Sequence, residues 1–365
     1  MHPTGPVARR FPLVARSRPV CLPLEARVGR LAELADTAAH RQDPGLASAV
    51  FNQVALLASD LGLREYAREL CHRHAALCLT GGPLPAMSAI RGLEPLVNLA
   101  RLQIRAGNHE RGHRLLLDLY RAVTTGTATL LGGVNVPARL TETDEQRAEV
   151  RAWLWRVVIA DGARALTAAG RWGDALRHIE EHRGIGRRIL DGRQVAVLAR
   201  ATAGDLAGAL GLLEATEPGD PWEDAVTAVL KALCRPGDHR ATEEAIGHWH
   251  GLADSEGLAV FTTRLGLTVL DASGSGTAAA RDLFHELVAR TAASADGYAL
   301  RDLLAHPAVR GALAVSHVRA LEGALGGCAL DSGDLPTAVR DRLENSLGRA
   351  RTVLEGGPVT AGGCG

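Results

Sequence analysis

The sequence repeats one local pattern, in which an apolar helix, a short turn containing glycine and a second apolar helix follow one another. The clearest copy spans residues 50–79 and turns at Gly62. The apolar residues before the turn recur at the spacing of one helical face, and they are Phe51, Val54, Leu57, Ala58 and Leu61. Gly62 can adopt the left-handed conformation that ends a helix. A chain built mainly from such pairs is predicted to be all-α.

The pattern returns around three further glycines, namely Gly107, Gly170 and Gly204. Three of the four turn glycines are followed five positions later by an alanine, in the order Ala67, Ala175 and Ala209, and Gly107 is followed by Gly112. With Phe51 eleven positions before Gly62, this arrangement resembles a tetratricopeptide repeat, although only the spacing from Gly170 to Gly204 equals that family's 34-residue period. The resemblance implies a right-handed α-solenoid of antiparallel helix pairs. The alternative is an all-helical protein made of unrelated hairpins.

Residues 25–355 are predicted to form a single repeat domain that is interrupted by one non-helical insertion at 124–145. The insertion is rich in glycine and β-branched residues, and it predicts a short hairpin across Gly132 and Gly133. An insertion of this length in a helical array is either a functional loop or a tolerated surface excursion.

Both ends of the chain differ in composition from this domain. Residues 1–24 are basic and are interrupted by five prolines, so they predict a disordered leader. This leader is also too short and too often broken by proline for a helix-turn-helix. Residues 356–365 are rich in glycine and predict a frayed tail.

The composition narrows the range of functions. The net charge is zero, so a nucleic-acid partner is not expected. Lys231 is the only lysine among 41 basic residues, a skew typical of a GC-rich bacterial genome, and lysine catalysis is therefore not expected. There is neither a signal peptide nor an apolar run of roughly eighteen residues, so we expect a cytoplasmic protein without a membrane partner. None of the six cysteines forms a C-x-x-C pair.

Two histidine motifs bear on an enzymatic alternative. His109-Glu110-x-x-His113 resembles the zincin metallopeptidase signature, in which the histidines bind zinc and the glutamate acts as a general base. Glu145 or Glu149 would have to supply the third zinc ligand. His178-x-x-Glu181-His182 has the inverted order, and Ile179 beside it suggests a packing role. Because the first motif occupies the start of an ordinary second helix, we expect no bound metal and no cofactor.

The remaining hypothesis concerns a groove. In tetratricopeptide-like arrays the first helices of successive pairs line a concave surface that binds an extended peptide. The positions six, nine or ten residues before the turn glycines hold six polar residues on these helices. They are Asn52, Asn98, Arg101, Asp161, Arg164 and Gln194. A short polar residue stands three positions before an arginine in two of the copies. These six residues are our candidate groove residues.

The sequence therefore favours a helical-repeat protein that acts by binding a protein or peptide partner through a concave groove, as an adaptor, regulatory or accessory protein. A zinc metallopeptidase that uses His109, Glu110 and His113 is the alternative from a different class. An oligomeric scaffold, built as a homo-oligomer, is the third hypothesis.

Overall fold

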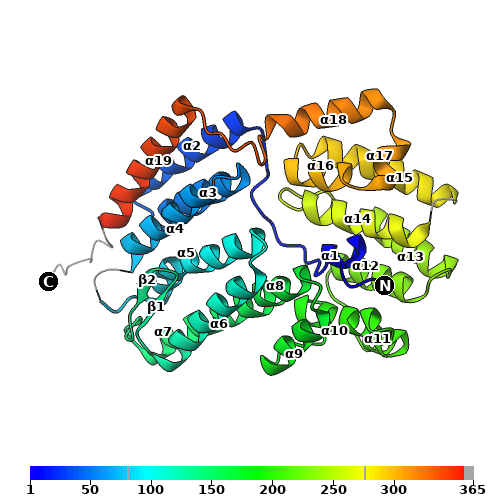
Figure 1. Ribbon diagram of the computed structural model, residues 1–365, viewed down its shortest axis with the longest axis horizontal. Coiled ribbons are helices and arrows are strands. Elements are labelled where there is room, and N and C mark those ends of the chain that lie inside the picture. Colours follow the sequence, from blue (N-terminus) through cyan, green and yellow to red (C-terminus); the bar gives the residue numbers. More distant parts are fainter. Residues whose placement is uncertain (80–81, 275–276, 357–365) are drawn as a thin grey trace. The chain divides into compact units, whose positions relative to one another are not determined.

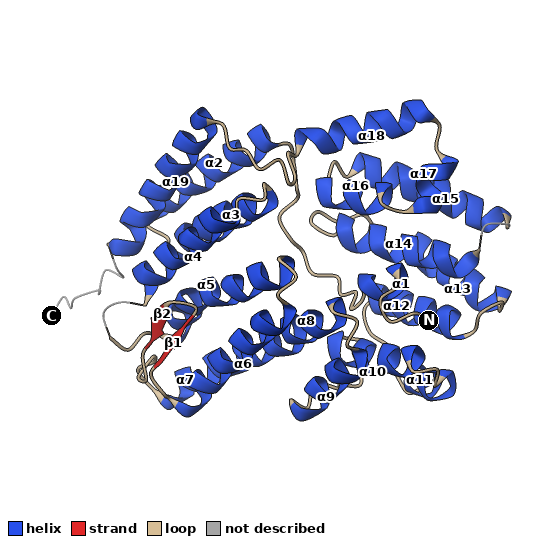
Figure 2. Ribbon diagram, viewed as in Figure 1, coloured by secondary structure: helices blue, strands red, loops and turns tan. Residues whose placement is uncertain are grey.

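The computed structural model describes residues 1–79, 82–274 and 277–356, which are almost entirely helical (Figures 1 and 2). Helices account for 71 % of the chain, about twice the roughly one-third of an average globular protein. Strands β1 (Thr129–Leu131) and β2 (Val134–Val136) form one antiparallel pair inside the predicted insertion. The predicted all-α fold with one short non-helical insertion is confirmed.

The chain divides into two compact units, which differs from the expected single domain over residues 25–355. Unit 1 contains residues 1–23 and 159–328, and unit 2 contains residues 24–158 and the chain from 329 onward. One of the three boundaries falls within η1 (Val158–Gly162), a π-helical turn that joins α7 (Asp144–Val157) to α8 (Ala163–Ala168) without a loop. Because no loop interrupts the helices at this point, composition could not reveal this boundary; the other two boundaries fall at 23/24 and 328/329, outside the helices. Of the expected tail at 356–365, all but the first residue lies outside the described residues.

Unit 2 is a set of antiparallel helix pairs closed by the last helix of the chain. Its other helices are α2 (Leu24–Arg41), α3 (Pro44–Asp60), α4 (Arg64–Cys78), α5 (Ala86–Arg105), α6 (His109–Thr125) and α19 (Thr337–Glu355). Helix α19 packs against α2 and α3. Leu343, Leu347 and Ala350 of α19 are fully buried in the shared core, so the C-terminal helix covers the apolar face that the first helices of unit 2 leave open.

Unit 1 contains α8 and the other described helices. They are α1 (Pro6–Arg10), α9 (Trp172–Glu181), α10 (Asp191–Thr202), α11 (Leu206–Glu214), α12 (Pro221–Cys234), α13 (His239–His250), α14 (Ala259–Ser273), α15 (Ala278–Ala293), α16 (Gly297–Leu304), α17 (Pro307–Ala312) and α18 (Val315–Gly327). Local signals set several boundaries. Helix α12, for example, begins with a capping box between Asp220 and Glu223 and has Pro221 at its first position.

The turn glycines have the conformation that the repeat pattern requires. The φ angles are 81° at Gly62, 84° at Gly107, 74° at Gly170 and 88° at Gly204, values that residues with a side chain rarely adopt. The alanines five positions later are fully buried, as predicted from sequence, and they are Ala67, Ala175 and Ala209. These small residues let the second helix of each pair approach the first closely.

The burial of these alanines leads to a stability prediction. Replacing Ala175 with leucine should overpack the contact between α8 and α9 and destabilise unit 1 by about 1–3 kcal/mol. Glu181→Leu, at an exposed position of the same helix, is the matched control and should change stability by no more than about 0.5 kcal/mol. Thermal unfolding monitored by circular dichroism measures both variants. Equal melting temperatures for the two would contradict the repeat register.

The hairpin predicted across Gly132 and Gly133 is also present. Leu131 pairs with Val134, so the two glycines form a two-residue loop. Their φ angles of 55° and 91° are both positive, as a type I′ turn requires.

Candidate functional site

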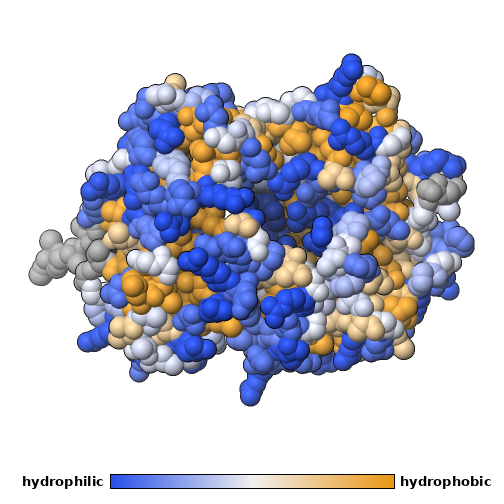
Figure 3. All heavy atoms as spheres, in the orientation of Figure 1, coloured by the Kyte–Doolittle hydropathy of each residue, from blue (hydrophilic) through white to orange (hydrophobic). Residues whose placement is uncertain are grey.

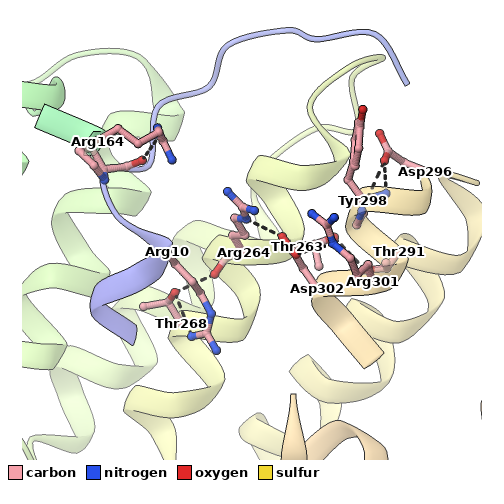
Figure 4. A network of polar contacts seen from close by, with 12 residues as sticks. Arg10, Arg164, Thr263, Arg264, Thr268, Thr291, Asp296, Tyr298, Arg301 and Asp302 are labelled. Atoms are coloured by element: carbon pink, nitrogen blue, oxygen red, sulfur yellow. Dashed lines mark hydrogen bonds and ion pairs between the residues drawn. The ribbon is translucent and has the colours of Figure 1, made fainter. Parts of the chain in front are cut away.

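The N-terminal segment of the chain lies on unit 1, where it runs from α1 past Arg164 and on toward α16 (Figures 1 and 4). This differs from the disordered leader expected for residues 1–24. The prolines do prevent a long helix, but four apolar residues between them are buried, and they are Ala8, Phe11, Leu13 and Cys21. Tertiary contacts therefore order a segment that has little secondary structure of its own.

Gln194 of α10 holds this segment by its main chain. Its side chain is fully buried, and its Nε2 donates hydrogen bonds to the carbonyl oxygens of Leu13 at 2.6 Å and Ile189 at 2.8 Å. The N–H of Leu13 donates to Gln194 Oε1 at 2.7 Å. The amide thus contacts both the donor and the acceptor of Leu13, as a neighbouring β-strand would do. These hydrogen bonds involve only main-chain atoms of Leu13, so they do not depend on the side chain at residue 13.

Charged groups hold the same segment on either side of Leu13. Arg164 donates from Nη2 to the carbonyl oxygen of Pro12 at 3.1 Å. Burial, and the positive charge of Arg264, lower the pKa of Arg164 to about 10, so it remains charged at neutral pH. Arg16 of the segment makes a two-pronged ion pair with the buried Asp191, with Nη1 at 3.1 Å from Oδ1 and Nη2 bonded to Oδ2.

Further contacts fix the ends of the segment. Arg10 Nη1 lies 2.5 Å from Asp271 Oδ2 on α14, and His306 contacts the other oxygen of Asp271 at 3.0 Å. Figure 4 shows Arg10 beside Thr268, whose hydroxyl oxygen accepts from it at 3.4 Å. The N–H of Gly297, at the start of α16, donates to the carbonyl oxygen of Cys21 at 2.8 Å.

Most of these contacts come from the first helices of successive pairs, which are the helices expected to line a peptide-binding groove. Of the three candidate residues in unit 1, Arg164 and Gln194 contact the extended segment, and Asp161 lies in η1, where its negative charge acts on Arg164. Asp191 and Asp271 were missed as contact residues. The sequence did contain one indication of these contacts. The basic leader includes Arg10 and Arg16, and an ordered leader would require acidic side chains elsewhere in the chain to pair with them.

The other three candidate residues lie together in unit 2, where they form a row of hydrogen bonds on α3 and α5. Asn52 donates from Nδ2 to Glu94 Oε2 at 2.8 Å, and Asn98 donates from Nδ2 to Asn52 Oδ1 at 2.9 Å. Arg101 then donates from Nη1 to Asn98 Oδ1 at 3.1 Å. Asn52 and Asn98 are half-buried and Arg101 is exposed. Burial raises the pKa of the Glu94 carboxyl. We call this set the Asn52–Asn98–Arg101 row.

The residues of the proposed zinc site do not converge on a metal-binding geometry. His109 is the first residue of α6, and Glu110 pairs with Arg114 at 2.8 Å. Within the described part of the chain, no group of three or more His, Cys, Asp or Glu side chains is placed to hold a metal ion. Neither Glu145 nor Glu149 therefore completes a site with His109 and His113.

In the inverted motif, His178 is buried and its ring lies 4.6 Å from that of His182. A Cβ on Gly162 would come within 2.6 Å of His178 Nε2, so this histidine fills the space beside a glycine of η1. The packing role expected for this stretch therefore extends to His178.

No helix among the described residues combines the length and the apolar character needed to cross a membrane. Comparison with protein-family models, with curated proteins and with solved structures gave no match.

Proposed function

We propose that this protein works by binding an extended segment of a partner protein on the Asn52–Asn98–Arg101 row, in an adaptor, regulatory or accessory role. One observation carries the proposal: in unit 1, Gln194 on a first helix holds an extended segment of the protein's own chain by its main-chain atoms. The same kind of helix face in unit 2 presents side chains of the same chemistry.

The repeat register, which rests on the resemblance to tetratricopeptide repeats, links the two faces. Gln194 stands ten residues before its turn glycine, Gly204, and Asn52 stands ten residues before Gly62. Both side chains end in a primary amide, which can donate to a carbonyl and accept from an N–H at the same time. We therefore expect the amide of Asn52, with that of Asn98 beside it, to face the main chain of a bound segment.

The two ends of the row carry opposite charges, which sets a preference in the partner. Arg101 is exposed, and its planar guanidinium suits two-pronged binding of a carboxylate. Glu94 provides a carboxylate at the other end. A partner segment with an acidic side chain or a free C-terminus near Arg101 would match this arrangement.

Selection from a displayed library of random peptides can test the proposal on the full chain. Peptides that also bind the Asn98→Ala, Arg101→Ala double variant are removed by counter-selection, and the remaining peptides are measured by fluorescence anisotropy. Because two side chains of the row are lost, we expect the double variant to bind these peptides at least about tenfold more weakly, or ~1.4 kcal/mol.

The matched control is Arg151→Ala, which removes an exposed arginine from α7 and should leave peptide affinity unchanged. Circular dichroism checks that the double variant folds, which is expected because Arg101 is exposed and Asn98 is not fully buried. Recovery of no peptide that distinguishes the wild type from the double variant would contradict the proposal.

A further inference from the structure

A second surface of unit 2 has a different chemistry. A hollow of about 700 Å³ lies among α4, α5, α6 and the tip of the β1–β2 hairpin. The hairpin contributes main chain at this point, because a Cβ on Gly132 would lie 3.3 Å from Leu99 and one on Gly133 would lie 3.0 Å from His72. The two glycines therefore let the hairpin tip approach α4 and α5 closely and form one wall of the hollow.

Three arginines give this hollow a positive charge, and they are Arg68, Arg111 and Arg114. Among the described residues, Arg68 and Arg114 pair only with exposed glutamates on their own helices, at 3.2 Å and 2.8 Å, and such surface pairs contribute little and exchange easily. Arg111 makes no ion pair with any described residue. Asp118, the one acidic residue of the lining, pairs with Arg121 at 3.4 Å. The arginines are therefore available to an acidic ligand.

Apolar side chains lie directly beside these charges. Leu99 and Leu115 line the hollow, and Leu130 of the hairpin is 71 % exposed at its edge. Figure 3 shows hydrophobic side chains reaching the surface in the region of the β1–β2 hairpin, next to hydrophilic ones. An apolar patch bordered by polar residues is typical of a surface that contacts another protein, and arginine is enriched at such surfaces.

A second, smaller hollow continues this surface toward α19. It shares Arg68 and His72 with the first and is also lined by Tyr66 and by Arg340 of α19. The guanidinium of Arg340 lies 5.2 Å above the Tyr66 ring. Burial and the charge of Arg68 lower the pKa of His72, so the positive charge at neutral pH comes from the arginines. Two adjoining open hollows suit an elongated ligand better than a compact small molecule.

We propose that this face, made by α4, α6 and the β1–β2 hairpin, binds an acidic segment of a partner protein that places an apolar side chain against Leu99, Leu115 and Leu130. Carboxylates flanking that side chain would pair with Arg68, Arg111 and Arg114. Glu65 and Glu69 line the second hollow, so the carboxylates of the segment belong in the first hollow and its uncharged part in the second. A nucleic acid carries a charge at every phosphate and would be repelled there, which favours a peptide. The surface lies mainly on second helices and is independent of the Asn52–Asn98–Arg101 row.

A defined probe tests this inference on the full chain. The probe is a fluorescein-labelled peptide of glutamates surrounding one leucine, with two comparison peptides in which serine replaces the leucine or lysines replace the glutamates. Fluorescence anisotropy is measured for the wild type, Arg111→Glu, Leu130→Ser and the control Arg151→Glu. We expect Arg111→Glu and Leu130→Ser each to weaken binding of the acidic leucine peptide at least about tenfold. Arg151→Glu should bind as the wild type does, and neither comparison peptide should bind as tightly.

Three results would overturn the inference. The first is that the wild type binds the probe no more tightly than Arg111→Glu does. The second is normal binding by Leu130→Ser, which would mean that charge alone attracts the peptide. The third is tighter binding of a labelled single-stranded oligonucleotide that is lost in Arg111→Glu. Asn98→Ala with Arg101→Ala should not change binding of this probe, so failure here is distinct from failure of the proposed function.

Discussion

Replacement of Gln194 by alanine is expected to loosen the N-terminal segment and to destabilise unit 1 by about 3 kcal/mol. The side chain makes three hydrogen bonds and is fully buried. Each such bond contributes about 1 kcal/mol net, and a buried main-chain group left without a partner costs more. Hydrogen exchange should become faster at the amide of Leu13, which loses its acceptor, and thermal unfolding should begin at a lower temperature.

Two further variants make this prediction specific. Gln194→Glu keeps the size and the acceptor for the Leu13 N–H but places a carboxylate against the carbonyl oxygens of Leu13 and Ile189. It should therefore be about as unstable as the alanine variant. Arg200→Ala, at a partly exposed position of the same helix, should change stability by less than about 0.5 kcal/mol. Unchanged exchange at Leu13 in both Gln194 variants would show that the segment is held by its apolar side chains alone.

The helix pairs were predictable from sequence because their determinants are local. A turn glycine, an apolar face before it and a small residue five positions later all lie within one short stretch, as around Gly62 and Ala67. The hairpin was predictable for the same reason, since two adjacent glycines specify a tight turn. The binding role that we infer for the hairpin was not predictable, because Leu130 and Arg111 come together only when the β1–β2 hairpin packs beside α6.

The division into units could not be predicted, because it depends on contacts between distant parts of the chain. The helical pattern continues through η1, and α19 returns to α2 and α3. The ordered N-terminal segment escaped prediction in a similar way. Proline spacing reports on local helix formation, whereas the order of Phe11 and Leu13 depends on residues far along the chain, including Gln194 and Arg164.

The candidate groove residues show what can and cannot be predicted by counting positions back from the turn glycines. Counting from turn glycines selected Arg164 and Gln194, which contact an extended segment, and also Asn52, Asn98 and Arg101, which bond to one another. The expectation that Arg101 and Arg164 share one concavity did not anticipate that they belong to different units. Asp271 stands only three positions before Gly274, the glycine that ends α14, so counting six to ten positions back from a turn glycine could not select it.

Replacement of Gly192 by alanine should be among the most destabilising single-methyl additions in this protein. An added Cβ would lie 2.1 Å from the carbonyl oxygen and 2.7 Å from the carbonyl carbon of Gly184, and these are main-chain atoms that cannot rotate away. We expect a loss of about 3–5 kcal/mol. The displaced start of α10 should also weaken the Asp191–Arg16 ion pair and the Gln194 contact with Leu13, so the N-terminal segment should exchange faster in this variant.

Gly211→Ala in the neighbouring helix α11 is the control, because this variant should stabilise the protein whereas Gly192→Ala should destabilise it. Nothing lies within 4 Å of a Cβ at that exposed position, and alanine favours a helix over glycine by about 1 kcal/mol. Thermal unfolding should therefore shift downward for Gly192→Ala and slightly upward for Gly211→Ala, although both variants add one methyl group to a helix. If both raised the melting temperature, Gly184 could move away without cost, and close approach of the two main chains would not hold α10 in the position from which Gln194 contacts Leu13.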